Sequence, residues 1–381
     1  MAGRIMIVAG EASGDMYGAR LVTEAHRLRP ELAFFGIGGK RMREAGVSIM
    51  VDAAEMAVVG LVEVIAHIGV IKGAFLGLRK IIRTDPPDLL ILIDYPDFNM
   101  LLAREARKRG VKVLYYISPQ IWAWRSGRVK KIARLVDHMA VVFPFEVPFY
   151  EQAGVPVTFV GHPLVDMVRP TMAIAEAKET FGIDPTRRTV GLFPGSRRGE
   201  VKRLFPVILE TAKKLKGRFP ELQFILPVAS SLSRADLEPL LKESGVELTL
   251  IDGRVHDVIQ VCDAIVTVSG TVTLEIALLG VPMVIIYRVA PLTYQIGKRF
   301  VRVDHIGICN IVAGERVVPE LVQDDAEPAR IAHEIGRMLT DDDYRQGVRE
   351  KLLKTRDLLG ESGGSGRIGR LAVDLMTMGS E

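Results

Sequence analysis

Residues 7–15 read Ile-Val-Ala-Gly-Glu-Ala-Ser-Gly-Asp, and this stretch decides the fold. The apolar run 5–9 predicts a short buried strand that ends at Gly10, and a helix is expected over about Asp15–Arg29. The loop between them presents backbone N–H groups to a polar or anionic ligand, although many such turns are only connections. The spacing is not Gly-x-Gly-x-x-Gly, and Glu11 would repel a pyrophosphate lying on the loop. A sugar hydroxyl therefore fits this loop better than a phosphate.

The same alternation of apolar runs and helical segments continues along the chain, as is typical of parallel sheets covered by helices. The strands expected in the first half are 5–9, 34–37, 89–93, 111–117, 138–142 and 158–160. The strands expected in the second half are 189–193, 223–227, 247–251, 264–268 and 282–287. The fold class is therefore α/β, with two Rossmann-like domains expected to face each other across a cleft.

A polar segment around Gly161-His162-Pro163 separates the two sets of strands and marks the expected domain boundary. We place the first domain at residues 1–165 and the second at 166–354. The C-terminal helices within 355–381 are expected to pack back on the first domain, after a flexible Gly360–Gly366.

Composition narrows the class of protein. The chain has 381 residues, 48% of them hydrophobic, and a net charge of only +4, which does not indicate a nucleic-acid partner. Cys262 and Cys309 offer neither a disulfide framework nor a zinc pattern, which fits a reducing compartment. No uncharged apolar run approaches the roughly 18 residues of a membrane span, so the protein is expected to be cytoplasmic.

Two loops in the second half predict a nucleotide site, and the first is Pro194-Gly195-Ser196-Arg197. Gly195 and Ser196 let the backbone approach a ligand, and Arg197 offers a forked donor suited to phosphate. The alternative is a helix entry with a solvated arginine.

The second loop is Ser269-Gly270-Thr271, which follows the strand 264–268. Its hydroxyls and free N–H groups suit a pyrophosphate, and Glu275, one helical turn later, can accept bonds from ribose hydroxyls. Helix capping alone would explain the same residues. Two such loops in one domain favour a nucleotide.

Asp94 ends a very apolar strand in the first half and is a candidate general base. A carboxylate there can be partly desolvated, which raises its pKa toward neutral. The alternative is an acceptor in a local turn, the role we expect for Asp97.

Two further segments suggest contacts with a lipid-linked sugar. The loop Ser118–Arg125 contains both tryptophans of the chain, with Trp124 followed by Arg125, and leads into a basic helix. Val58–Ile82 is apolar and ends in basic residues, which suits either an ordinary pair of core helices or an acyl-binding surface at a membrane.

Other polar residues give weaker signals. Asp341-Asp342-Asp343 satisfies the Asp-x-Asp pattern of metal-dependent transferases, but it precedes a helix far from any strand end and is expected to be an N-cap. We therefore expect no metal and no other cofactor. His162 lies where a residue of the cleft would lie, and a structural role is equally expected.

Together these motifs resemble those of the lipid-A-disaccharide synthase family, and Asn-Ile-Val-Ala-Gly at 310–314 resembles a further one. The resemblance covers nearly the whole chain. It implies a metal-independent, inverting enzyme of the glycosyltransferase-B fold, with an acceptor and acyl-sugar domain followed by a UDP-binding domain. The reaction joins UDP-2,3-diacylglucosamine to 2,3-diacylglucosamine 1-phosphate through a β-1,6 linkage and releases UDP.

The resemblance also implies work at an anionic surface, the inner face of the cytoplasmic membrane of Gram-negative bacteria. Asp94 would deprotonate the acceptor hydroxyl, and Glu11 would assist electrostatically. The other expected roles are UDP binding by Gly195, Ser196, Arg197, Ser269, Gly270, Thr271 and Glu275, and sugar contacts by Ser13, Trp124, Arg125, His162 and Asn310. The oligomeric state stays open, with a homodimer as one option.

Two rival functions share parts of this pattern. A UDP-sugar 2-epimerase would use the same architecture and nucleotide site, but it needs no acyl-binding surface. A regulatory module that binds a nucleotide without catalysis would not need Asp94.

Overall fold

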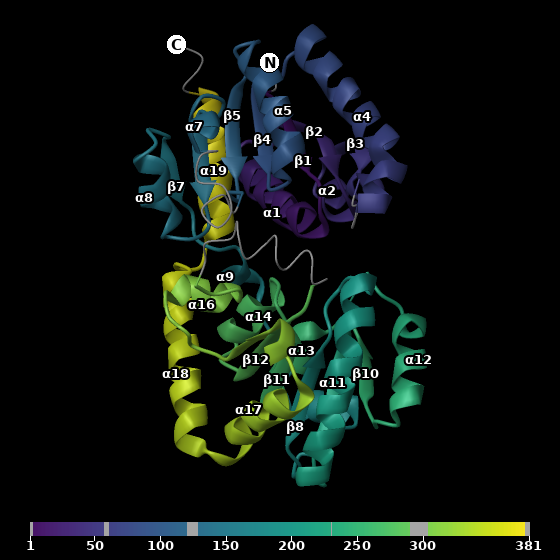
Figure 1. Cartoon of the computed structure of the whole chain (residues 1–381). Coiled ribbons are helices and arrows are strands. Elements are labelled where there is room, and N and C mark those ends of the chain that lie inside the picture. Colours follow the sequence, from purple (N-terminus) through teal and green to yellow (C-terminus); the bar gives the residue numbers. More distant parts are fainter. Residues whose placement is uncertain (1–2, 57–60, 120–128, 230, 290–303, 378–381) are drawn as a thin grey trace. The chain divides into compact units, whose positions relative to one another are not determined.

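The computed structural model describes residues 3–56, 61–119, 129–229, 231–289 and 304–377 (Figure 1). The chain divides into two compact units, unit 1 with Met1–Asp166 and Leu359–Glu381, and unit 2 with Met167–Leu358. Each unit is built on its own parallel sheet.

Unit 1 contains a seven-stranded parallel sheet in the order β3-β2-β1-β4-β5-β6-β7. Its strands are β1 (Arg4–Ala9), β2 (Ala33–Gly38), β3 (Ser48–Asp52), β4 (Leu89–Ile93), β5 (Lys112–Tyr116), β6 (His138–Val141) and β7 (Val157–Phe159). Its helices are α1 (Ala12–Leu28), α2 (Lys40–Glu44), α3 (Ala53–Met56), α4 (Leu61–Thr84), α5 (Pro96–Arg107), α7 (Val129–Ala133), α8 (Glu146–Glu151), α9 (Leu164–Met167), which ends one residue into unit 2, and α19 (Gly364–Thr377).

Both faces of this sheet are buried. Alternate residues of the central strands, such as Met6 and Leu90, pack with α4 and α5 in one core. The residues between them, such as Ile7 and Ile91, are equally inaccessible and belong to the opposite face, since side chains alternate along a strand. The helices α1 and α19 pack against each other, and each also contacts the sheet. The C-terminal helix thus belongs to unit 1.

Unit 2 contains a six-stranded parallel sheet in the order β10-β9-β8-β11-β12-β13. Its strands are β8 (Thr189–Phe193), β9 (Gln223–Val228), β10 (Thr249–Asp252), β11 (Ala264–Val268), β12 (Met283–Tyr287) and β13 (Glu320–Val322). Its helices are α10 (Ile174–Phe181), α11 (Arg198–Arg218), α12 (Arg234–Ser244), α13 (Val255–Gln260), α14 (Val272–Leu278), α16 (Ile308–Ala313), α17 (Pro328–Thr340) and α18 (Asp342–Leu358), with a 3-10 turn at Gln323–Asp325.

The α/β class and the two Rossmann-like units are confirmed, and the expected strands are present with shifts of one or two residues. Two edge strands, β3 and β13, were not predicted. The helix α1 begins at Ala12, three residues before the prediction. The expected flexible stretch 360–366 was wrong in its second half, because α19 begins at Gly364.

Candidate functional site

The strand order places the predicted loops at one particular point of each sheet. In both parallel sheets the strand order switches sides of the first strand, so the switch point lies between β1 and β4 in unit 1 and between β8 and β11 in unit 2. Ligands of doubly wound sheets bind outside the carboxyl ends of the strands at this switch point. The loops after β1 and β4 carry Glu11 and Asp94, and the loops after β8 and β11 carry Arg197 and Ser269.

Asp94 has an unusual backbone. Asp94 and Tyr95 both have φ of +47°, the left-handed region that non-glycine residues occupy at a cost of roughly 1–2 kcal/mol each. The N–H of Asp94 still bonds to the carbonyl of Tyr116 at 3.3 Å, so the chain leaves the sheet immediately afterwards. Burial raises the pKa of the Asp94 carboxyl to about 6, and the charge of Glu11 adds to the effect. A base with this pKa is largely ionised at neutral pH and accepts a proton readily.

The loop after β1 lies against the Asp94 loop. A side chain at Gly10 would come within 2.5 Å of the Tyr95 ring, so only glycine allows this contact. Glu11 is exposed, and Ser13 is partly buried. Asp15, the last residue of the opening motif, is structural, because its carboxylate accepts the N–H groups of residues 39, 41 and 42.

The aromatic loop lies only partly within the described residues. Trp124 and Arg125 fall outside them, so their predicted sugar contacts stay predictions. At the start of the loop Ser118 is buried, with its hydroxyl 2.6 Å from that of Tyr150.

His162 lies inside unit 1 and only 6% of it is exposed. Its Nδ1 accepts the N–H of Leu164 at 3.2 Å, and its ring packs edge-on to Tyr17 and tilted against Phe143. Burial lowers the pKa of His162 to about 3, so the ring is neutral at physiological pH. These contacts favour the structural role over the predicted sugar contact.

In unit 2, the loop after β8 turns at Gly195, which has φ of +101°. A side chain there would come within 2.8 Å of the Glu200 carboxylate. Ser196 and Arg197 are exposed, and the Arg197 guanidinium lies 3.1 Å from Glu200. An exposed ion pair of this kind adds little stability, so Arg197 can exchange its partner for a phosphate at small cost.

The loop after β11 is fixed by its serine. The Ser269 hydroxyl donates to the carbonyl of Ile306 at 2.8 Å, which uses its proton within the protein. Gly270 has open space where a side chain would stand, and Thr271 is exposed at the start of α14. The Ser269 N–H also donates within the protein, to the carbonyl of Ile286 at 3.2 Å, so the Ser269 side chain can only accept a further bond.

Glu275 has a partner that the sequence did not indicate. Its carboxylate lies 3.0 Å from Nε2 of His256, which is on α13, and both side chains are mostly buried. The hydrogen bond to Glu275 raises the pKa of His256. His256 and Glu275 do not belong to one sequence motif, so the contact between them is visible only in the folded structure.

Asn310 is wholly buried in α16. Its amide donates to Val318 and Glu320, and its oxygen accepts the N–H groups of Val317 and Val318. The protein itself occupies both ends of this side chain, which favours a structural role, and the direct sugar contact stays a prediction.

The apolar segment 58–82 is one helix from Leu61 onward, α4, rather than a pair of core helices. Leu78 is buried, while Val70 and Leu76 are exposed. The basic residues at its end are partly neutralised, since Arg79 and Arg83 both bond to Glu105. Within the described residues, no helix is long and apolar enough to cross a membrane.

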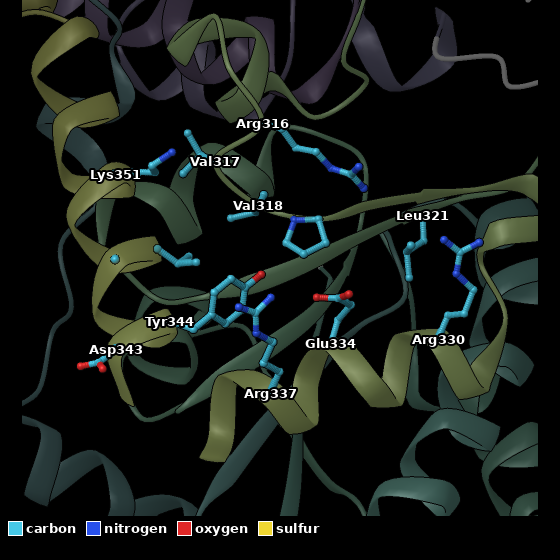
Figure 2. Close-up of a pocket in the computed structure, with 13 residues that line it drawn as sticks. Arg316, Val317, Val318, Leu321, Arg330, Glu334, Arg337, Asp343, Tyr344 and Lys351 are labelled. Atoms are coloured by element: carbon cyan, nitrogen blue, oxygen red, sulfur yellow. The ribbon is translucent and has the colours of Figure 1, made fainter. Parts of the chain in front are cut away.

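Asp341 follows the capping prediction, because its Oδ1 accepts the N–H of Tyr344 at 2.9 Å at the start of α18. A recess of about 560 Å³ lies nearby, between α17 and α18 (Figure 2). The cations that line it already have partners: Arg330 with Asp325, Arg337 over the Tyr344 ring, Lys351 with Glu315 and Arg316 with the Glu320 carbonyl. The residues that line the recess therefore form a network of surface contacts, and they are separate from the switch-point loops.

Comparisons with known proteins agree with the motifs. The family model described as lipid-A-disaccharide synthetase matches residues 5–363. The lipid-A-disaccharide synthase of Geobacter sulfurreducens is 69% identical over 98% of this chain and 97% of its own length. That of Nitrosococcus oceani is 50% identical over 98% and 96%.

Solved structures share the fold at low identity. The UDP-GlcNAc 2-epimerase from Neisseria meningitidis bound to UDP-GlcNAc has a TM-score of 0.65 at 13% identity, covering 98% of this chain and 100% of its own. Anabaena HepE in complex with UDP and glucose has a TM-score of 0.55 at 14% identity, covering all of both chains. These likenesses show the fold alone, whereas the family match spans the sequence. The chain belongs to the lipid-A-disaccharide synthase family of UDP-sugar glycosyltransferases.

Proposed function

We propose that the chain joins UDP-2,3-diacylglucosamine to 2,3-diacylglucosamine 1-phosphate, with Asp94 as the base and unit 2 as the holder of UDP. The observation that carries this proposal is the position of Asp94. It stands at the switch point of its sheet in a strained backbone, with a carboxyl pKa of about 6.

The chemistry follows from that carboxylate. Asp94 takes the proton of the acceptor 6-hydroxyl while the oxygen of that hydroxyl attacks the anomeric carbon of the donor. The bond from that carbon to UDP breaks at the same time. The attack occurs opposite the leaving group, so the configuration inverts. The exposed Glu11 adds negative charge that favours the oxocarbenium character of the transition state.

The departing UDP carries the negative charge that develops. Arg197 and the backbone around Gly270 are the groups of unit 2 best suited to receive its phosphates. Glu275 is suited to the ribose hydroxyls because carboxylate oxygens are acceptors, and its bond to His256 fixes its orientation.

We also propose that the exposed apolar residues of α4, together with the lysines beside them, meet the acyl chains or an anionic membrane surface. Val70 and Leu76 are exposed on this helix, and Lys72 and Lys80 are exposed with them. The location at the inner face of the cytoplasmic membrane belongs to this proposal.

The test is to incubate the protein with both acylated sugars and to measure UDP and disaccharide together. Equal amounts of both products are expected. Consumption of the UDP-sugar without disaccharide would overturn the transferase proposal and favour an epimerase or hydrolase. Asp94→Asn in the same assay tests the base separately.

A further inference from the structure

The left-handed backbone at Asp94 is held by two buried side chains from different elements. The carbonyl oxygen of Asp94 accepts a hydrogen bond from the Tyr115 hydroxyl at 2.7 Å and another from the Asn99 amide nitrogen at 2.6 Å. Tyr115 lies on the neighbouring strand β5, and Asn99 lies in the first turns of α5. The two donors therefore approach the same oxygen from the sheet and from the helix.

Both donors have fixed roles. Tyr115 and Asn99 are completely inaccessible to solvent. The Asn99 amide nitrogen also donates to the carbonyl of Ile93 at 3.2 Å, so both of its contacts are acceptors and the amide cannot be reversed. Its oxygen has no hydrogen-bond partner among the described residues. A buried unsatisfied oxygen is costly, which indicates that the donor end of this side chain matters more than its acceptor end.

Tyr115 remains a donor at every working pH. Burial raises the pKa of its hydroxyl well above the ordinary value, and the nearby charge of Asp94 acts in the same direction. The proton of the hydroxyl is thus always present to bond the Asp94 carbonyl.

The sheet explains why a clamp is needed. Leu90 and Leu92 point into the core beneath α4 and α5, and one more residue of strand would send Asp94 to the same face. The turn at Asp94 ends that alternation, but it requires a backbone that is uncommon for non-glycine residues, at Tyr95 above all. The two hydrogen bonds to the Asp94 carbonyl stabilise this left-handed conformation.

We infer that Tyr115 and Asn99 are positioning residues that clamp the Asp94 carbonyl and thereby hold its carboxylate in the orientation and environment that the reaction requires. This inference rests on the proposed role of Asp94 as the base. It adds that the activity of Asp94 depends on donors that do not touch the sugars.

Tyr115→Phe is the decisive variant, because it removes one hydroxyl and keeps the ring. We expect kcat to fall on the order of tenfold or more, since a small misplacement of a catalytic group is costly, while the KM for the UDP-sugar stays within about twofold. The acid limb of kcat/KM, expected near pH 6 in the parent, should move about half a unit or more lower as Asp94 becomes better solvated. Asn99→Ala should act in the same direction.

Thr355→Val is the matched control. It also removes a buried hydroxyl that bonds a carbonyl, that of Lys351 at 2.9 Å, but it lies on α18 in unit 2. The free energy of unfolding of Thr355→Val should fall as in Tyr115→Phe, whereas kcat and the acid limb of kcat/KM should stay as in the parent. A merely structural Tyr115 would behave like this control, and that result would overturn the clamp.

Failure of the clamp can be told from failure of the base. If Asp94→Asn is inactive while Tyr115→Phe and Asn99→Ala keep the parent kcat and acid limb, the base stands and the clamp is wrong. If Asp94→Asn is active, the base is wrong, and crystal structures of Tyr115→Phe and Asn99→Ala then decide the clamp by themselves. A φ of Asp94 that stays near +47° in both would overturn it, and a φ that leaves the left-handed region would support it.

Discussion

Replacing Asp94 with asparagine should make the protein more stable at neutral pH while it removes the proposed base. The pKa of the Asp94 carboxyl is about 6 in the folded protein, raised from 3.8 mainly by burial. Two units of pKa correspond to about 3 kcal/mol, at 1.36 kcal/mol each. Because the folded state binds the proton more tightly, stability falls as the pH rises from about 4 to about 6, and the full penalty is present above that.

Asparagine removes this penalty at every pH and accepts the left-handed backbone readily. At about pH 5 the Asp94 carboxyl of the folded protein is roughly nine-tenths protonated. The stability penalty is therefore about 1.4 kcal/mol smaller at pH 5 than at pH 8. The stability of Asp94→Asn relative to the parent should therefore grow by about 1.4 kcal/mol between pH 5 and pH 8.

The assay is urea unfolding of both proteins at these two pH values, followed by circular dichroism. Asp97→Asn, which changes an exposed carboxylate in the first turn of α5, is the matched control for the loss of a carboxylate next to Asp94 and is measured at the same two pH values. Turnover of Asp94→Asn should fall on the order of 10²-fold or more. A stability difference that is the same at both pH values would refute the reasoning, because it would mean that the carboxyl is not desolvated.

Three further variants test the other assignments. Arg197→Ala should raise the KM for the UDP-sugar on the order of tenfold and change the free energy of unfolding by less than about 0.5 kcal/mol. Arg330→Ala, which removes an equally exposed paired arginine, should leave the KM unchanged. Equal KM values in both variants would remove Arg197 from the nucleotide site. Glu275→Gln should weaken UDP binding in calorimetry by about tenfold. It should also abolish the stabilisation from the raised pKa of His256, which is present below about pH 6.5 and is lost as the pH rises through the higher folded value. Asn310→Ala should cost about 2–3 kcal/mol in urea unfolding, because it removes the acceptor of the buried Val318 N–H and the donor to the Val318 carbonyl. A variant of unchanged stability with a raised KM would instead support the predicted sugar contact.

The centre of each sheet could be predicted because its strands are continuous apolar runs buried on both faces, such as Leu89–Ile93 and Ala264–Val268. The edge strands Ser48–Asp52 and Glu320–Val322 could not, since they are short and mostly only partly buried.

For the site, sequence reasoning reached the loops but not their internal contacts. Asp94 was recognisable as a carboxylate at a strand end, yet neither it nor Tyr95 indicates a left-handed backbone, because no glycine marks it. The bond between Glu275 and His256 on α13 depends on how α13 and α14 pack on either side of β11, which no local motif indicates. Asn310 did carry a signal, since an asparagine among Ile308, Cys309, Ile311 and Val312 is typical of a buried, fully bonded amide.

The packing of α19 against α1 has a consequence for synthesis of the chain on the ribosome. The helix that covers one face of the first sheet is translated only after the whole of unit 2. Unit 2 is continuous in sequence and can complete its core as soon as α18 has emerged. The unit that begins the chain is thus the last to finish folding, and until then the apolar face along α1 is open to chaperones.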